Sequence, residues 1–279
     1  MADTAFQTQY RDEFIAGFEE RQSFLRDICV TEAVVKGNTA TFLVADSGSA
    51  TAVTRGVNGL IPARSDNLTQ PSATLAEWHD LATKSGFNVF ASQGDQRRIM
   101  QETTMAVINR KIDSDIITQL DTATIDTGTS ATASVAMVAT AKAALGYADV
   151  PTEEEDNIFG VVTPGFMAYL AQAKEFASKE YVDVTMFSGK TRRMLRWFGV
   201  NWIEHRGLTG AQTSTEQCYL LHRNAIGHAV DTSGVQSAVG YNDEQDYSYA
   251  RCSVYMGSKK LQNTGIVQMK HDGSAFALS

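Results

Sequence analysis

The segment Gly189-Lys190-Thr191 is the part of the chain most suggestive of phosphate chemistry. A Gly-Lys-Thr ending can place a lysine against the phosphates of a nucleotide. The full phosphate-binding pattern also needs a glycine five residues before Gly189, and Val184 stands at that position. The pattern is therefore incomplete, and we interpret the segment as a surface turn.

Two groups of side chains could in principle bind a metal ion: Cys218 with His222 and His228, and the acidic group Asp243, Glu244 and Asp246. A structural zinc site needs closer-spaced pairs and a fourth ligand, which the first group lacks. A calcium loop needs acidic residues at alternate positions around a glycine, which the second group lacks. We predict no metal site.

Catalytic patterns are also missing from the sequence. Asp113 and Asp115 are two residues apart, so on a helix they point to different faces and cannot form a catalytic pair. The chain contains no Gly-x-Ser-x-Gly and no Gly-x-Gly-x-x-Gly. We therefore predict no catalytic residues and no cofactor, and we expect a protein that is not an enzyme.

Composition restricts the remaining classes of protein. With 279 residues, 43% of them hydrophobic and 20% charged, the chain can bury one or two cores. It has no apolar run long enough to span a membrane, and its first residues lack the features of a signal peptide. Three widely separated cysteines suggest reduced thiols in a cytoplasmic setting. A net charge of −8 disfavours tight wrapping of nucleic acid.

The elements that could present a surface lie between Thr39 and Thr122. A polar excursion of about Asp46 to Trp78 is rich in turn residues and lies between two strand-like runs, 41–44 and 87–90. Its apolar residues need a surface to cover: Val53, Val57, Leu60, Ile61, Leu68, Leu75, Trp78 and Leu81. A ribbon of this kind is marginally stable alone. Either it lies on a neighbouring subunit or it is an active-site lid.

A long helix is expected after the excursion. No Gly or Pro occurs from Asp95 to Asp126, Ser92 can act as the N-cap, and five apolar residues recur at helical spacing: Met105, Ile108, Ile112, Ile116 and Leu120. Five polar residues occupy the other faces: Arg110, Lys111, Asp113, Asp115 and Gln119. A helix of about 28 residues would be about 42 Å long. It is either a spine for the excursion or a core helix of a bundle.

The two ends of the chain predict different elements. The start, through about Lys36, reads as an acidic amphipathic arm that docks on its own domain or on a neighbour. The end alternates, with Ala250, Cys252, Val254 and Met256 apolar, and a last strand covers 265–269. We expect these strands to return to the sheet that supports the long helix.

The middle of the chain reads as an α/β segment. It predicts a small-residue helix at 135–145, a buried strand at 157–162, and a helix that starts with Thr163 as N-cap and Pro164. Further strands are expected at 199–204 and 216–222. A basic patch follows the second helix, formed by Lys190, Arg192, Arg193 and Arg196. It is a solvated face, a partner for acidic residues such as 153–156 of a neighbour, or a weak contact to nucleic acid.

In this order of elements the chain resembles the major capsid protein of tailed bacteriophages, whose fold herpesvirus shells share. The segments Ala52–Pro62 and Ile108–Ile117 carry the local likeness, on the extended loop and on the spine helix. The resemblance implies an α+β fold with an N-terminal arm (1–38), an extended β-hairpin loop with flanking strands (39–90), a peripheral domain (91–125 and 240–279) and an axial α/β domain (126–239).

The resemblance also implies a function and partners. The chain would self-assemble into hexamers and pentamers that form an icosahedral shell around double-stranded DNA, which it would contact weakly. A separate scaffolding protein is expected, because the sequence shows no long charged helical extension at its start, together with a portal and in some shells a decoration protein. Assembly would take place in the bacterial host cytoplasm, without a membrane.

The candidate contacts between subunits come from the loop, the acidic turn and the basic patch. They are Arg55, Leu60, Ile61, Leu68, Trp78, Glu153, Glu154, Glu155, Arg192, Arg193 and Arg196. Two other classes stay open: a tail-tube or other filament protein, and, less favoured, an enzyme with a long lid.

Overall fold

The computed structural model describes residues 22–31, 33–47, 50–64, 67–86, 88, 96–174, 194–231 and 233–277. The amphipathic arm before residue 22, the helix start at Ser92, and the basic residues Lys190, Arg192 and Arg193 lie outside these ranges. The chain forms two compact units. Unit 1 comprises Met1–Ser23, Ala76–Asp113 and Val230–Met256, and unit 2 comprises Phe24–Leu75, Ser114–Ala229 and Gly257–Ser279.

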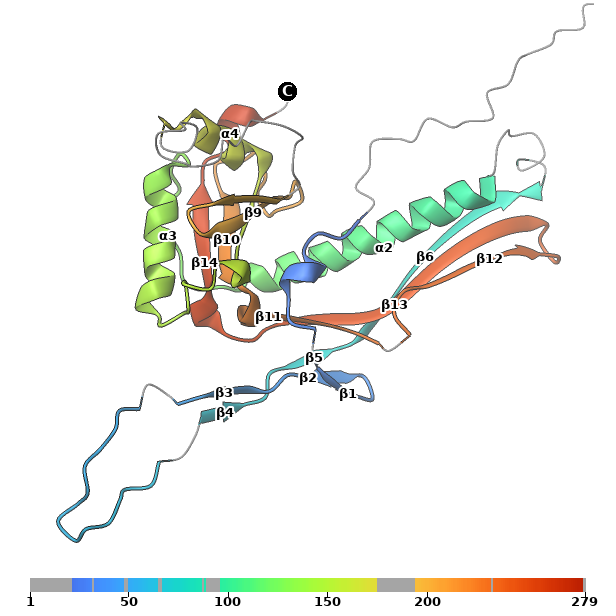
Figure 1. Cartoon of the computed structure of the whole chain (residues 1–279). Helices are drawn as coiled ribbons and strands as arrows, with labels where there is room; N and C mark the ends of the chain where they lie inside the picture. Colours follow the sequence, from blue (N-terminus) through green and yellow to red (C-terminus); the bar gives the residue numbers. More distant parts are fainter. Residues whose placement is uncertain are drawn as a thin grey trace, which may run out of the picture. The chain divides into compact units, whose positions relative to one another are not determined.

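Unit 1 is built around a long antiparallel sheet. Strand β13 (Tyr247–Lys260) pairs with β12 (Gln236–Asn242) on one side and with β6 (Ala76–Ser85) on the other (Figure 1). Alternate residues of β13 are buried, namely Ala250, Cys252, Val254 and Met256, as the sequence predicts. Such alternation marks a sheet with one covered face.

Helix α2 (Gln96–Leu120) supplies that cover in unit 1. The Thr104 hydroxyl lies 3.4 Å from the Cys252 thiol, and the Gln101 amide donates to the Ser237 hydroxyl at 2.9 Å. At 25 residues the helix confirms the predicted long element. Its stripe is buried at Ile108, Ile112, Ile116 and Leu120, as amphipathic packing requires.

One acidic residue of this helix is buried. The pattern places Asp113 away from the apolar stripe, and the structure shows it only 2% exposed. The Ser23 hydroxyl donates a hydrogen bond to its carboxylate at 2.5 Å. Burial is possible because this polar partner replaces water.

Unit 2 holds a five-stranded mixed sheet of order β14-β10-β7-β9-β8. Its strands are β7 (Ile158–Val162), β8 (Met194–Trp197), β9 (Val200–Glu204), β10 (Glu216–His222) and β14 (Ile266–His271). Every residue of β7 is buried, which fits its place in the middle of the sheet. The pair β7–β9 is parallel and the other pairs are antiparallel.

The helices of unit 2 start where the sequence predicts. Helix α3 (Val135–Tyr147) is capped by the Ser134 hydroxyl, and α4 (Pro164–Gln172) by the Thr163 hydroxyl, which accepts from Phe166 N. Helix α3 continues beyond the predicted end at residue 145, through Gly146 to Tyr147, and Ala148 is its C-cap. The described residues also form short 3-10 turns: η1 (Arg26–Ile28), η2 (Glu155–Asn157), η3 (Arg223–Ala225), η4 (Asn263–Gly265) and η5 (Ser274–Phe276).

A second small sheet in unit 2 carries the excursion. Its order is β1 (Val34–Lys36), β2 (Thr39–Thr41) and β5 (Ser72–Thr74). Ala40, Phe42 and Ala73 pack with Ala229 of β11 (Ile226–Val230) in a separate small core. The chain then continues as the two-stranded ribbon of β3 (Val44–Asp46) and β4 (Asn67–Thr69).

The strand expected at 87–90 lies where only residue 88 is described, and the strand before it, β6, was not predicted. Most residues of β6 are exposed, so no apolar run marks it. One strand prediction was wrong. The last strand, β14, pairs with β10 of the five-stranded sheet, and not with the sheet that packs on α2 in unit 1. Hydrophobic alternation predicts a strand but does not select its sheet.

Candidate functional site

The excursion is a hairpin whose two arms are bonded near the small sheet. Phe42 N donates to Pro71 O at 2.9 Å, and Val44, Ala45 and Asp46 stand opposite Thr69, Leu68 and Asn67. The Asn67 side-chain amide donates to the Asp46 carboxylate at 2.9 Å. Beyond this point the described chain, 50–64, forms neither strand nor helix. The bonded ribbon therefore positions a long loop.

The tip of the loop has a tight turn of its own. Gly59 N donates to Gly56 O at 2.8 Å, and Gly56 N donates to Leu60 O at 3.0 Å. Gly59 adopts φ +70°, a conformation that side chains with a Cβ disfavour. The Arg55 guanidinium reaches Gly59 O at 3.4 Å. Arg55 and its neighbours thus stand on a defined turn.

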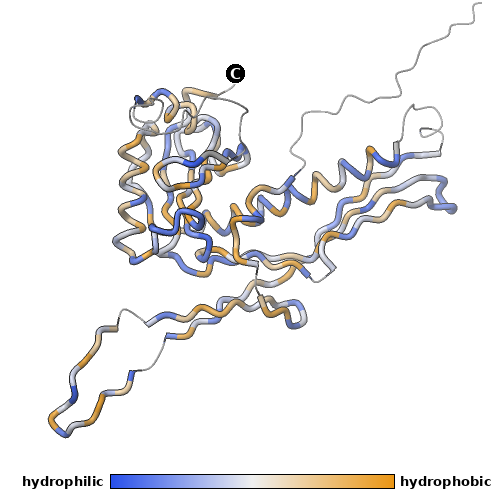
Figure 2. Tube along the Cα trace, in the orientation of Figure 1, coloured by the Kyte–Doolittle hydropathy of each residue, from blue (hydrophilic) through white to orange (hydrophobic). Residues whose placement is uncertain are grey.

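All described residues from Ala50 to Arg64 are exposed, including the apolar ones. Val57 is fully exposed, and Leu60 and Ile61 are 73% and 68% exposed. Figure 2 shows hydrophobic segments along this loop. Single exposed apolar residues are ordinary, but several on one loop mark an interaction surface. The role of Leu60 and Ile61 as contact residues stays a prediction, and so does that of Leu68, which is exposed on β4.

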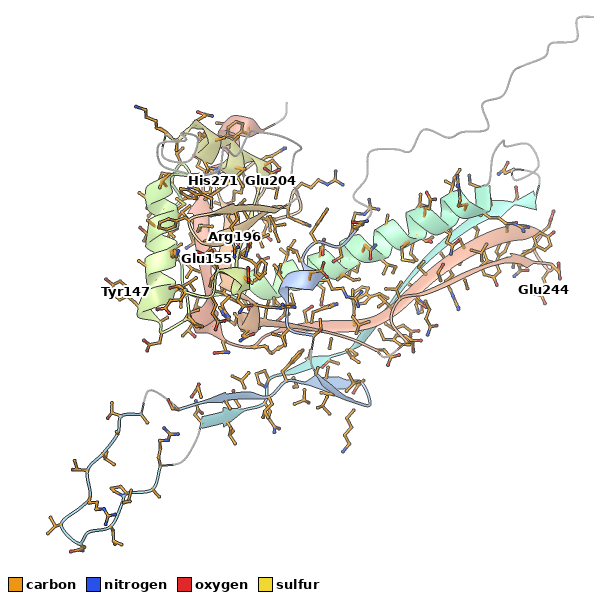
Figure 3. All side chains as sticks on the ribbon, in the orientation of Figure 1. Tyr147, Glu155, Arg196, Glu204, Glu244 and His271 are labelled. Atoms are coloured by element: carbon orange, nitrogen blue, oxygen red, sulfur yellow. The ribbon has the colours of Figure 1, made fainter. Side chains whose placement is uncertain are left out.

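The acidic residues 153–156 contact Arg196, the described residue of the basic patch, within the same chain. Arg196 Nη2 lies 2.6 Å from Asp156 Oδ1, and Arg196 Nε lies 3.5 Å from Glu155 Oε2. Figure 3 shows Glu155 and Arg196 side by side in unit 2. The Asn157 amide donates to Glu154 at 2.6 Å. The sequence suggested a pairing between subunits, whereas Arg196 here has acidic partners in its own chain.

Two further candidates differ in setting. Glu153 is exposed, and its place at a subunit contact stays a prediction. Trp78 does not lie in the loop. It lies on β6 and is half-buried there. The Lys111 ammonium stands 3.9 Å from the centre of its ring, a cation–π contact within unit 1.

The most enzyme-like place in the described part of the chain is a cavity of about 230 Å³ at the start of α4. Its lining includes Glu216, Arg206 and Phe276. Glu216 is buried and accepts hydrogen bonds from the Thr163 hydroxyl and from Gln212 N. The Thr163 hydroxyl that donates to Glu216 is also the N-cap of α4, so Glu216 reads as a structural carboxylate that joins α4 to the 210–215 loop.

Metal-binding side chains do not gather in the described ranges, where no group of three or more His, Cys, Asp or Glu could hold an ion. The three cysteines are buried free thiols. Burial raises the pKa of the Cys218 thiol to about 12, which makes it unreactive. No helix among the described residues has the length and apolar character needed to cross a membrane.

The sequence pattern undervalued one surface, the turn between β12 and β13. Asp243, Glu244 and Asp246 were weighed only as cation ligands. The structure adds two exposed apolar side chains on β12, Val239 and Tyr241, at 40% and 45% exposure. The strand alternation could have indicated them, because both fall on the same face of β12.

Solved structures of phage capsids share this fold. The chain is similar to the structure of Mycobacterium phage Che8, with a TM-score of 0.75 and 15% identity over 96% of this chain and 98% of that one. It is similar to the cyanophage Pam1 capsid, with a TM-score of 0.73 and 11% identity over 98% of both chains. It is also similar to the capsid of cyanophage P-SCSP1u, with a TM-score of 0.70 and 13% identity over 96% of this chain and 93% of that one. No curated protein matches the chain.

The fold is therefore that of phage capsid subunits, mixed helix and sheet with a long helix and a projecting loop. The family model for phage capsid proteins matches residues 2–273, and the chain belongs to that family. It is a structural protein of the virion that forms a capsid shell.

Proposed function

We propose that the chain assembles into hexamers and pentamers, and that the loop 50–64 with its ribbon lies on a neighbouring copy. The observation that carries this proposal is the exposure of Val57, Leu60 and Ile61 on a turn that has hydrogen bonds of its own. A loop of this length without a core is usually functional or disordered. The internal turn favours a functional role.

The energetics support an intermolecular contact. Burying one Val, Leu or Ile side chain contributes about 1.5–3 kcal/mol. Three such side chains on one loop offer several kcal/mol to a partner surface, before the cost of ordering the loop is subtracted. Because the same contact repeats between neighbours around a closed ring, the total stabilisation increases with the number of copies.

Domain roles follow from the same proposal. The five-stranded sheet of unit 2, with α3 and α4, is the axial domain, and the sheet of unit 1 with its part of α2 is the peripheral domain. The residues before β1 are the N-terminal arm. In the host cytoplasm the subunit would meet a scaffolding protein, a portal and in some shells a decoration protein. Packaged double-stranded DNA would contact it weakly, because the chain carries a net charge of −8.

We also propose that the protein has no enzymatic activity. The Glu216 carboxylate in the cavity at the start of α4 accepts hydrogen bonds from Thr163 and Gln212 N, and the Thr163 hydroxyl is engaged as the cap of that helix. A filament-forming virion protein could use the same loop, but it would give tubes in place of closed shells.

The test is to purify the full chain and examine it by sedimentation velocity and negative-stain electron microscopy over a range of concentrations. Closed shells or capsomer rings support the proposal. Tubes would indicate the filament function, and a protein that stays monomeric at every concentration would contradict self-assembly.

A further inference from the structure

We propose that the β12–β13 turn, residues 243–246 of one copy, binds the loop tip around Arg55 of another copy. The inference rests on the proposed function, because it names the surface on which the loop lies. It assigns a partner to the loop and a role to the acidic residues Asp243, Glu244 and Asp246.

The loop tip is positively charged and apolar. From Ala50 to Arg64 the sequence has two arginines, Arg55 and Arg64, and no acidic residue. Arg55 stands beside the turn formed by Gly56 and Gly59, next to the exposed Val57. A surface complementary to it must be acidic with apolar neighbours.

The β12–β13 turn has both properties. Asp243, Glu244 and Asp246 are exposed, and no Lys or Arg occurs from Gln236 to Ala250. Val239 and Tyr241 add exposed apolar surface beside it. Figure 3 shows Glu244 at the far end of the β12–β13 hairpin. The charge and the apolar content of this turn therefore match those of the loop tip.

The turn is also held in one conformation. β12 and β13 pair without interruption as far as Asn242 opposite Tyr247. The Asn242 side-chain oxygen accepts from Glu244 N at 3.0 Å and from Gln245 N at 3.1 Å. The Tyr241 hydroxyl donates to Asp246, and Gly86 N donates to Asp246 O at 3.0 Å. A preformed turn loses little entropy on binding.

The other exposed acidic run, Glu153 to Asp156, fits less well. Arg196 already pairs with two of its carboxylates, and Asn157 donates to a third. In contrast, none of the described cations forms an ion pair with Asp243 or Glu244. The β12–β13 turn therefore offers the less compensated negative charge to an incoming arginine.

The first test measures proximity without altering either charge. Thr54 and Gln245 are exposed and uncharged, and each is adjacent to a proposed contact residue. The variant Thr54→Cys with Gln245→Cys, assembled and mildly oxidised, should give a ladder of disulfide-linked multimers on a non-reducing gel. The native thiols at Cys29, Cys218 and Cys252 are buried, so they contribute little background.

The matched control places the second cysteine beside the other acidic run, as Thr54→Cys with Thr152→Cys. It should stay at monomer mobility. A ladder from the control, or only monomers from the Gln245 variant while shells form, would overturn the inference and leave the proposed function intact. Absence of all particles and of all ladders would overturn both.

The second test uses charge reversal. Arg55→Glu should raise the protein concentration needed for assembly about tenfold or more, since about 1.4 kcal/mol per contact corresponds to tenfold. Adding Asp243→Lys and Glu244→Lys to that variant should restore most of the loss. Adding Glu153→Lys and Glu154→Lys should not. Equal rescue by both pairs, or assembly unaffected by Arg55→Glu, would contradict the assignment.

Discussion

The hydroxyl of Tyr219, in the second strand of the five-stranded sheet, donates a hydrogen bond to the carboxylate of Asp121, just beyond the end of α2. Thr209 donates to the other oxygen of the same carboxylate at 2.7 Å. Burial, and then the hydrogen bond to Asp121, raise the pKa of the Tyr219 hydroxyl, so this residue remains a neutral donor. The pair joins the end of the long helix to the sheet within unit 2.

Removing this hydroxyl should destabilise unit 2. Tyr219→Phe leaves the ring in place and deprives Asp121 of one donor, so we expect a loss of about 1–3 kcal/mol in the free energy of unfolding. Urea unfolding followed by tryptophan fluorescence measures it. The double variant with Asp121→Asn should lose less than the sum of the single variants, and simple additivity would show that the pair is not coupled.

Gly160 of β7 is expected to tolerate no side chain. A Cβ at this position would lie 2.6 Å from the ring of Trp202, which stands opposite on β9. Trp202 is 1% exposed and cannot move into solvent. Gly160→Val should therefore cost about 1–3 kcal/mol by overpacking. The control Gly146→Ala, where nothing lies within 4 Å of the added Cβ, should not destabilise the fold.

The salt bridge of Arg196 should contribute little to stability. Its side chain is 50% exposed and that of Asp156 is 92% exposed, so solvent screens the pair. Arg196→Ala should change the free energy of unfolding by no more than about 1 kcal/mol. The same variant should still assemble. Assembly lost with stability unchanged would show that Arg196 binds an acidic residue of a neighbour, as the sequence suggested.

Stability should fall between pH 7 and pH 5 in part because of His271. The ring is fully buried, and burial lowers its pKa below the ordinary value of 6.5, although Glu216 and Ala131 O act in the opposite direction. The folded state therefore binds fewer protons than the unfolded state as the pH falls through 6.5. This share of stability is present above that pH and is lost below it.

The check is to compare the free energy of unfolding of the wild type and His271→Gln across this range. The variant should show the shallower fall with decreasing pH, whatever its stability at pH 7. A fall of equal or greater steepness in the variant would contradict the assignment to His271.

The sequence predicts the parts whose pattern is local. The stripe from Ile108 to Leu120, the cap at Thr163 and the alternation from Ala250 to Met256 each follow from a side-chain period or a capping rule, and all three are confirmed. The polar strand β6 was missed because its exposed residues leave no apolar period to find. The burial of Asp113 could not be predicted because its partner, Ser23, is far away in sequence.

For the candidate site too, the sequence predicts local features and misses contacts between distant residues. Turn residues and isolated apolar residues predict an exposed loop, and residues 50–64 are exposed. Pairing across the fold is not local, so sequence spacing could not show that Arg196 faces Asp156, nor that Lys111 covers Trp78. The charge of the sequence likewise does not distinguish residues 153–156 from residues 243–246. The two acidic runs differ in the structure, because Arg196 already pairs with the first.

The measurement that tests the central claim most directly is assembly of a loop-tip variant. Val57→Ser with Leu60→Ser and Ile61→Ser removes exposed apolar surface that contacts no core, so the variant should keep the unfolding free energy of the wild-type subunit. Sedimentation velocity and negative-stain microscopy of both proteins at equal concentration should show closed shells for the wild type and free subunits for the variant. Normal shells from the variant would contradict the account.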